Sequence, residues 1–227
     1  MTSRRPLVHS SLREQVYAVL RDDLDSGALR PGVTINLDNV ARQLGVSRTP
    51  LRDALLRLEI EGFVTIRPRS GVVVRTLTET DIRNLYQLIG ALEASVLLSE
   101  RQALTPAHIA NMERANAVMK AALVGDDFDT YYSANLTLHN AYIEMSANAE
   151  LIHRLTIMKQ RLYDFPRKRH FVKEWEMAST GEHERIVFAL QNGDVREAAR
   201  LVQEVHWSFE VQEPFIRRYY LAEMEAV

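Results

Sequence analysis

Residues 44–64 read LGVSRTPLRDALLRLEIEGFV and contain a tight turn, a helix start, an apolar helical face and a helix end. Gly45 supplies the turn, and the side chain of Ser47 can accept a hydrogen bond from the free amides that open the helix. Pro50 is tolerated in this first turn, and Gly62 ends the helix. The residues that recur on its inward face are Leu51, Leu55 and Leu58. The stretch therefore predicts a helix that crosses a preceding helix at a tight turn.

The residues before this stretch predict two further helices. Apolar residues recur at helical spacing over residues 11–25, and the Ser, Gly and Pro residues that follow end the pattern. Asn36 can cap a short second helix that runs to about Leu44. A helix-turn-helix is therefore expected at about residues 36–55.

The residues after the stretch predict a β-hairpin. Residues 63–66 and 72–75 read as two short strands, and the basic residues Arg67 and Arg69 lie in the segment that connects them. Three helices followed by a basic hairpin are typical of a winged helix-turn-helix, in which the hairpin is the wing. We therefore place a first domain, of the DNA-binding kind, at residues 1–75.

Beyond residue 75 the sequence reads as helical. Residues 76–80 form a short polar linker, in which Thr78 or Thr80 can cap the next helix. Six helices are expected near residues 80–101, 105–123, 127–147, 149–164, 174–192 and 195–220. Since no repeat or sustained heptad is present, a packed bundle over residues 81–227 is expected. The fold class is mainly α: a winged helix-turn-helix followed by an all-α bundle.

The charge is distributed unevenly along the chain. The net charge is −2, yet residues 1–75 carry 12 arginines and 8 acidic residues, a net of +4, whereas the remainder carries 16 basic and 22 acidic residues, a net of −6. Only the first part suits a polyanion such as DNA. A solvated basic face without a partner is an equally common cause of such asymmetry, so the placement of individual residues must decide.

The composition favours a cytoplasmic protein. The chain has no cysteine, which excludes disulfides and thiolate metal sites. The first residues contain no apolar run typical of a signal peptide. No stretch approaches the roughly 20 apolar residues of a membrane span, so no membrane partner is expected.

The third helix carries a basic face beside its apolar one. Arg48, Thr49 and Arg52 fall within roughly 100° of one another at 3.6 residues per turn. An α-helix fits the major groove, where a guanidinium can bind guanine O6 and N7 together, and Arg67 and Arg69 can follow the adjacent backbone or minor groove. Arg48 and Arg52 are the expected base readers. The alternative is that both are solvated surface arginines.

These residues resemble the signature of a known family. Residues 44–55, together with RLE at 57–59 and EGFV at 61–64, are similar to the DNA-binding signature of GntR regulators, and GALRPG at residues 27–32 is similar to the family's turn between its first two helices. The resemblance covers nearly all of residues 10–75. The residues that it implies touch DNA are Ser47, Arg48, Thr49, Arg52 and Gly71. Some members carry a further basic contact where this chain has Asp38.

Three of the seven histidines share an unusual placement in the second domain. His139, His183 and His206 each lie on or beside the apolar side of an expected helix, and so point into the bundle. Three buried imidazoles are costly to charge or to leave unpaired, whereas a divalent metal ion satisfies all three. A metal site and a metal-free pocket are both compatible with this placement.

The second domain resembles the FCD effector domain of the FadR subfamily, and the six-helix, VanR-like variant in particular. In that domain an acid four residues before a histidine joins two later histidines around a metal; His139, His183 and His206 match, and Asn135 stands at the acid's position. The resemblance implies zinc, nickel or manganese. Ile89 stands where many members carry an arginine for an acidic effector, and Tyr142, on the face with His139, is a further candidate for the pocket.

These features predict a transcription regulator that acts as a repressor, binds a pseudo-palindromic operator as a homodimer and responds to a small organic acid. The rival class is a metal-dependent hydrolase, for which Glu182, Glu184 or Glu144 is the available base, although spacing ties none of them to the histidines. A third alternative is an architectural DNA binder without an effector. Such a binder does not need an interior histidine cluster, and a hydrolase does not need the winged head.

Overall fold

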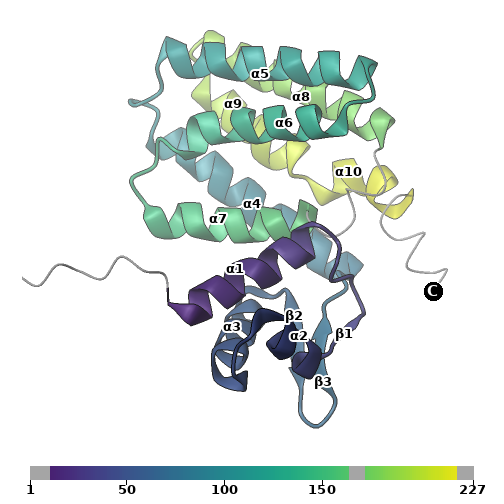
Figure 1. Ribbon diagram of the computed structural model, residues 1–227. Helices are drawn as coiled ribbons and strands as arrows, with labels where there is room; N and C mark the ends of the chain where they lie inside the picture. Colours follow the sequence, from purple (N-terminus) through teal and green to yellow (C-terminus); the bar gives the residue numbers. More distant parts are fainter. Residues whose placement is uncertain (1–10, 164–171, 219–227) are drawn as a thin grey trace, which may run out of the picture. The chain divides into compact units, whose positions relative to one another are not determined.

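The computed structural model describes residues 11–163 and 172–218 as two compact units, one ending at Thr76 and the other beginning at Leu77 (Figure 1). The chain is mainly helical, as expected, with one small sheet in the first unit. Among the described residues, no helix combines the length and the apolarity that a membrane crossing requires.

The first unit has the expected three helices and hairpin, with one additional strand. Its elements are α1 (Leu12–Asp25), β1 (Thr34–Ile35), α2 (Leu37–Leu44), α3 (Arg48–Glu61), β2 (Val64–Arg67) and β3 (Gly71–Val74). All strands pair antiparallel in the order β1-β3-β2, with Thr34 opposite Val73. The short strand β1 was not expected from the sequence, because two residues are too few to show an alternating pattern.

The helix starts of this unit explain its sharp boundaries. Asn36 caps α2 by accepting from the amide of Asn39 at 2.9 Å, as expected. Ser47 is the residue before α3, but no backbone amide of the described residues donates the expected hydrogen bond to its side chain. An N-cap side chain binds the amide two or three residues on, and here the third residue is Pro50, which has no N–H. The Ser47 hydroxyl is therefore left exposed at the start of α3.

The second unit is a bundle of helices in which α5 packs most extensively on α6 and also lies against α8 (Figure 1). Its elements are α4 (Glu79–Ser99), α5 (Pro106–Val124), α6 (Phe128–Ile143), α7 (Ala149–Tyr163), α8 (Lys173–Gln191), α9 (Val195–Leu201), the π-helical turn η1 (Val202–His206) and α10 (Phe209–Ile216). Thr78 caps α4 in a capping box with Asp81, as expected.

The sixth expected helix, at residues 195–220, is not continuous. It widens into η1 and breaks at Trp207 and Ser208, and Ser208 then caps α10. Gly90 of α4 lies against this break: a Cβ atom at Gly90 would come within 2.8 Å of the Trp207 Cβ atom. The close approach of α4 thus accompanies the departure from regular helix. The expected far ends of two helices, at residue 164 and residues 219–220, lie outside the described residues.

Candidate nucleic-acid interface and candidate metal centre

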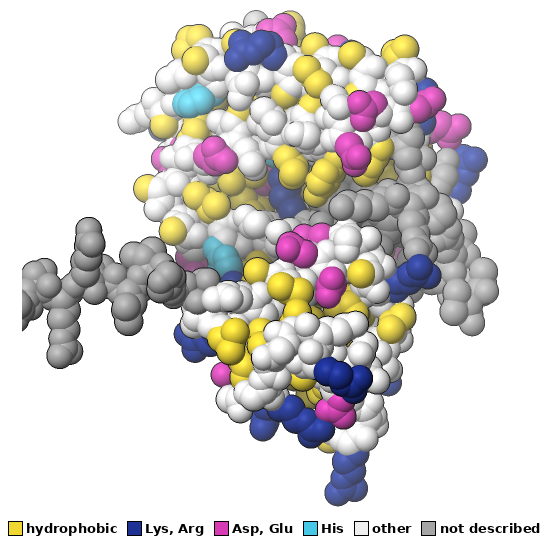
Figure 2. Space-filling view, viewed as in Figure 1, with side chains coloured by type: hydrophobic (Ala, Val, Ile, Leu, Met, Phe, Trp, Pro, Cys, Tyr) yellow, Lys and Arg dark blue, Asp and Glu magenta, His cyan; other side chains and the backbone are white. Residues whose placement is uncertain are grey.

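The proposed DNA-contacting side chains lie on the surface of the first unit. Arg48, Thr49 and Arg52 are exposed on the first turns of α3, beside the exposed Ser47. The hairpin presents Arg67 and Arg69, also exposed, and Figure 2 shows that Lys and Arg side chains gather over this part of the unit. Gly71 opens β3 with a φ of 91°, a left-handed conformation that favours glycine. None of these guanidinium groups is buried in the protein's own fold.

Arg48 has a partner that the helical plot did not anticipate. Its guanidinium forms an ion pair with Asp38 of α2, with 2.6 Å between the Nη2 and Oδ1 atoms. Both side chains are well exposed, so the pair contributes little to stability. Its effect is on orientation, because Asp38 holds the charge of Arg48 against the start of α2.

The three histidines predicted to converge lie together inside the second unit. His139 comes from α6, His183 from α8 and His206 from the end of η1. All three are buried, and one ligand atom from each lies within 4.8 Å of the others. The ring centroids of His183 and His206 are 4.7 Å apart, and those of His139 and His206 are 5.1 Å apart. We call these three side chains the imidazole cluster.

Several nitrogen atoms of the imidazole cluster have no hydrogen-bond partner within the part of the chain that the structure describes. These atoms are Nε2 of His139 and both Nδ1 and Nε2 of His183. A buried polar atom without a partner loses free energy relative to water, so such atoms need an explanation. Nitrogen donors with free lone pairs, gathered from three helical segments, are the ligands that divalent transition metals prefer. The residues present therefore fit a metal ion.

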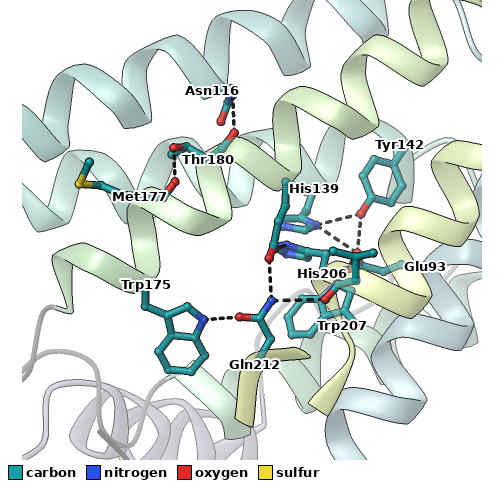
Figure 3. Close-up of polar contacts among 12 residues, drawn as sticks. Glu93, Asn116, His139, Tyr142, Trp175, Met177, Thr180, His206, Trp207 and Gln212 are labelled. Atoms are coloured by element: carbon teal, nitrogen blue, oxygen red, sulfur yellow. Dashed lines mark hydrogen bonds and ion pairs between the residues drawn. The ribbon is translucent and has the colours of Figure 1, made fainter. Parts of the chain in front are cut away.

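His139 is held from behind by a buried carboxylate. Its Nδ1 atom lies 3.0 Å from Oε2 of Glu93, which is fully buried on α4. The same oxygen accepts from the hydroxyl of Tyr142 and, at 2.9 Å, from the indole Nε1 of Trp207 (Figure 3). Lys159 of α7 forms an ion pair with the other oxygen at 2.5 Å. A His139 ring that donates from Nδ1 presents the Nε2 lone pair to the cluster.

His206 is held in the same way by a second carboxylate. Its Nδ1 atom lies 2.8 Å from Oε2 of Glu182. The sequence did not tie Glu182 to the histidines, and the structure corrects this point, because Glu182 precedes His183 on α8 and reaches His206 across the helix packing. Glu144 and Glu184 do not join the site: Glu144 is the exposed residue that follows α6, and Glu184 forms an ion pair with Lys120 on the surface.

The electrostatic environment lowers the pKa of two of these imidazoles, His139 and His183. Burial, followed by the nearby charge of Lys159, lowers the pKa of His139 to about 4. Burial, followed by the charge of His206, lowers the pKa of His183 well below its ordinary value. Burial alone would raise the pKa of Glu93, but the charges of Lys159 and His139 outweigh it, and the pKa falls well below its ordinary value. Neutral imidazole is the form that binds metal.

The remaining predicted pocket residues are also buried near the cluster. Asn135 is 3% exposed on α6, one turn before His139. Ile89 is fully buried on α4, one turn before Glu93, and Tyr142 is 1% exposed with its hydroxyl on Glu93. Lys159 and Gln212 were not anticipated as part of the site, whereas Trp207 was expected only as a residue of the core or the pocket wall. The only sequence feature that could have indicated Lys159 is its position as a basic residue on the apolar side of its helix.

Two family models match the chain. Residues 12–74 match the bacterial regulatory proteins of the gntR family, and residues 84–206, more than half of the chain, match the FCD domain. The chain belongs to the GntR family. This GntR member is a DNA-binding transcriptional regulator with an FCD domain, and not an enzyme, because the family and its relatives are regulators. The hydrolase alternative is thereby excluded.

Curated relatives and a solved structure agree with this assignment. An uncharacterized HTH-type transcriptional regulator of Agrobacterium vitis is 30% identical over 136 residues, which are 58% of this chain and 78% of the relative. The "Probable D-xylose utilization operon transcriptional repressor" of Paenarthrobacter nicotinovorans is 27% identical and covers 85% of this chain and 84% of its own. Three further regulators align over 63%, 59% and 58% of their own lengths. The structure of E. coli McbR/YncC, 21% identical, has the same fold with a TM-score of 0.67, covering 95% of this chain and all of that one.

Proposed function

We propose that this GntR regulator is a metal-dependent, acid-responsive repressor. The DNA-binding head occupies residues 1–75, and the effector-binding and dimerisation domain occupies residues 81–227. The observation that carries the proposal is the imidazole cluster, in which Nε2 of His139 and both ring nitrogens of His183 are buried without a hydrogen-bond partner among the described residues. An architectural DNA binder has no use for such a cluster. Repression is supported by the relative from Paenarthrobacter nicotinovorans, which is named a repressor.

In this proposal the ion is held by His139, His183 and His206, with the side-chain oxygen of Asn135 as a fourth ligand. Zinc, nickel or manganese suits imidazole and oxygen ligands. All four ligands are neutral, so a divalent ion keeps its +2 charge and attracts an anion. A bound ion supplies a positive charge and open coordination positions to a carboxylate effector. Ile89 and Tyr142 lie on the two helices that carry Glu93 and His139, and so contribute apolar surface and a hydroxyl near the effector.

At the other end of the chain, Arg48 and Arg52 read base edges in the major groove. Ser47 and Thr49 hold phosphate at the start of α3, and Arg67, Arg69 and Gly71 of the hairpin contact the backbone or the minor groove. The effector changes DNA affinity only to the extent that it binds one arrangement of the dimer better than the other. The loss of repression on effector binding then follows from a change in the spacing of two heads.

Replacement of Arg52 tests the DNA-binding role. In a gel shift with the promoter region upstream of the protein's own gene, Arg52→Ala is expected to weaken specific binding about 5- to 150-fold, because a bidentate contact to guanine is worth roughly 1–3 kcal/mol. The matched control is Arg154→Ala on α7, which removes one exposed arginine from the other unit. Equal affinity of the Arg52→Ala variant and the unchanged protein for this promoter rejects the role.

Calorimetry tests the metal and the effector together. Zinc-loaded protein is titrated with a panel of small mono- and dicarboxylic acids, and the acid that binds is then titrated into zinc-treated His183→Ala protein. We expect the variant to lose both the ion and the acid, because the ion carries the charge that attracts the carboxylate. Elemental analysis of the purified dimer gives an independent measure of the bound ion. Binding of the acid with the same affinity to both proteins excludes contact through the metal.

A further inference from the structure

A chain of buried and partly buried hydrogen bonds leads from His206 away from the other two imidazoles (Figure 3). Glu182 of α8 accepts from His206 through Oε2, and its Oε1 atom accepts from Nε2 of Gln212 at 2.8 Å. The Oε1 atom of Gln212 in turn accepts from the indole Nε1 of Trp175 at 2.7 Å. We call His206, Glu182, Gln212 and Trp175 the relay. It joins η1, α8 and α10.

Gln212 has a defined orientation within the relay. It is 3% exposed, and its Nε2 atom also lies 3.3 Å from the carbonyl oxygen of Val205. Its oxygen faces the one donor, Trp175, and its nitrogen faces two acceptors, so a flipped amide would lose all three hydrogen bonds. A buried network in which every member is satisfied fixes a single arrangement, and the loss of one member leaves the others unsatisfied.

Gln212 of the relay lies on α10, and this helix contacts the beginning of α4. Within the second unit, Glu210 of α10 forms an ion pair with Arg83 of α4, and the guanidinium of Arg83 lies 3.9 Å from the centre of the Phe209 ring. Arg217, which follows α10, forms an ion pair with Glu79 at 3.0 Å. Glu79 is the first residue of α4, and only four residues separate α4 from β3 of the hairpin. These contacts join α10 and Arg217 to the first turns of α4, the helix that follows the DNA-binding unit in the sequence.

We propose that Glu182 and Gln212 are positioning residues for His206, and that the relay couples ion binding at the imidazole cluster to the docking of α10. This inference rests on the proposed metal site. With a bound ion, the ring of His206 would donate a stronger hydrogen bond from Nδ1 to Glu182, because a metal–ligand bond makes the ring N–H more acidic. A Glu182 side chain with less conformational freedom fixes Gln212 through their hydrogen bond. Local opening of α10 away from α8 then becomes rarer. Reciprocally, a docked α10 raises the affinity for the ion.

Hydrogen exchange measures the coupling. Amide exchange of α10 is followed in the full-length protein with and without zinc, for the unchanged sequence and for Glu182→Gln, Gln212→Leu and Trp175→Phe. Zinc is expected to slow exchange of α10 about fivefold or more in the unchanged protein and much less in the variants. Glu182→Gln is also expected to lower zinc affinity about 10- to 100-fold. Trp175→Phe keeps an aromatic ring and removes one donor, so it reports on the relay if Gln212→Leu does not fold.

Asn116→Leu is the matched control. Asn116 is a buried amide on α5 that donates to the carbonyl oxygen of Thr180 on α8 at 3.0 Å, and it has no bond to the relay (Figure 3). Zinc should protect α10 in this variant as in the unchanged protein. Equal protection by zinc in the relay variants would overturn the coupling. If the unchanged protein binds zinc without a change in α10 exchange, the coupling is also wrong while the metal site stands.

A measurement without metal separates the inference from the metal site. Nitrogen NMR of zinc-free protein is expected to show His206 as the tautomer protonated on Nδ1, and Glu182→Gln and Gln212→Leu should increase the Nε2-protonated form. An Nε2-protonated ring in the unchanged protein would overturn the positioning role. If the unchanged protein binds no zinc, the metal site and the coupling both fail, and the tautomer alone decides whether Glu182 and Gln212 position His206.

Discussion

The buried ring of His139 makes the metal-free protein sensitive to acid. Its pKa is about 4 in the folded chain, against about 6.5 when unfolded, because burial and Lys159 oppose its charge. Between these two values the unfolded chain binds more protons, so the free energy of unfolding falls as the pH falls from 6.5 to 4. His139 alone is expected to account for a loss of about 3 kcal/mol, at 1.36 kcal/mol per pKa unit.

Urea unfolding of chelator-treated protein between pH 7.5 and pH 4 checks this expectation. His139→Gln should flatten the dependence on pH, whereas His153→Gln, at an exposed position on α7, should leave it unchanged. A slope that persists in full in His139→Gln would show that other groups cause the sensitivity to acid.

The sequence predicted the three imidazoles but not Glu182 and Gln212, which form the hydrogen bonds that orient His206. His139, His183 and His206 were found because each shares a helical face with apolar neighbours, and burial follows from such periodicity. Glu182 and Gln212 reach His206 only through the crossing of α8, η1 and α10, and the angle between helices leaves no mark on local periodicity. The absent side-chain cap at Ser47 was within reach of the sequence, since Pro50 stands where the bonded amide is required.

At the scale of elements, Gly90 is expected to control the packing of α4 on η1. A methyl group at this position would meet the Cβ atom of Trp207 at 2.8 Å and the Cα atom of Gln203 at 3.4 Å, and neither atom belongs to the flexible end of a side chain. Gly90→Ala is therefore expected to destabilise the protein by about 1–3 kcal/mol despite the better helix propensity of alanine. Thermal unfolding measures the effect.

Gly181→Ala is the matched control for Gly90→Ala. It lies in the middle of α8, and a Cβ atom there would meet no atom within 4 Å. This variant should gain rather than lose stability. A loss in Gly181→Ala equal to that in Gly90→Ala would show that the contact with Trp207 is not the cause.

The broken sixth helix marks the limit of prediction at this scale. The apolar pattern over residues 195–220 favoured one helix, and in a regular helix His206 and Gln212, six residues apart, would point about 120° from each other. The widened turn η1 and the break at Ser208 bring both side chains to Glu182. No residue type in this segment forbids a regular helix before Pro214, so the break depends on packing against α4.

At the scale of the whole molecule, operator binding is expected to require two chains. The proposed contacts from one α3 reach only a few base pairs, and two half-sites about one helical turn apart supply the affinity that one head lacks. Sedimentation with operator duplex should give two chains per duplex. A duplex with one half-site scrambled should bind far more weakly, and a single chain bound to the intact duplex at full affinity would contradict the dimer.

The ion pair between Asp38 and Arg48 has a consequence for how the regulator moves along a chromosome. On sequences without the operator, a phosphate must displace Asp38 to engage Arg48, and an arginine that is already neutralised releases fewer counterions on contact. Dwell times on such DNA should shorten, and the protein should scan more base pairs in a given time. In the proposed interface, Asp38 thus lowers the charge that Arg48 offers to non-operator DNA, which favours faster search over tighter binding.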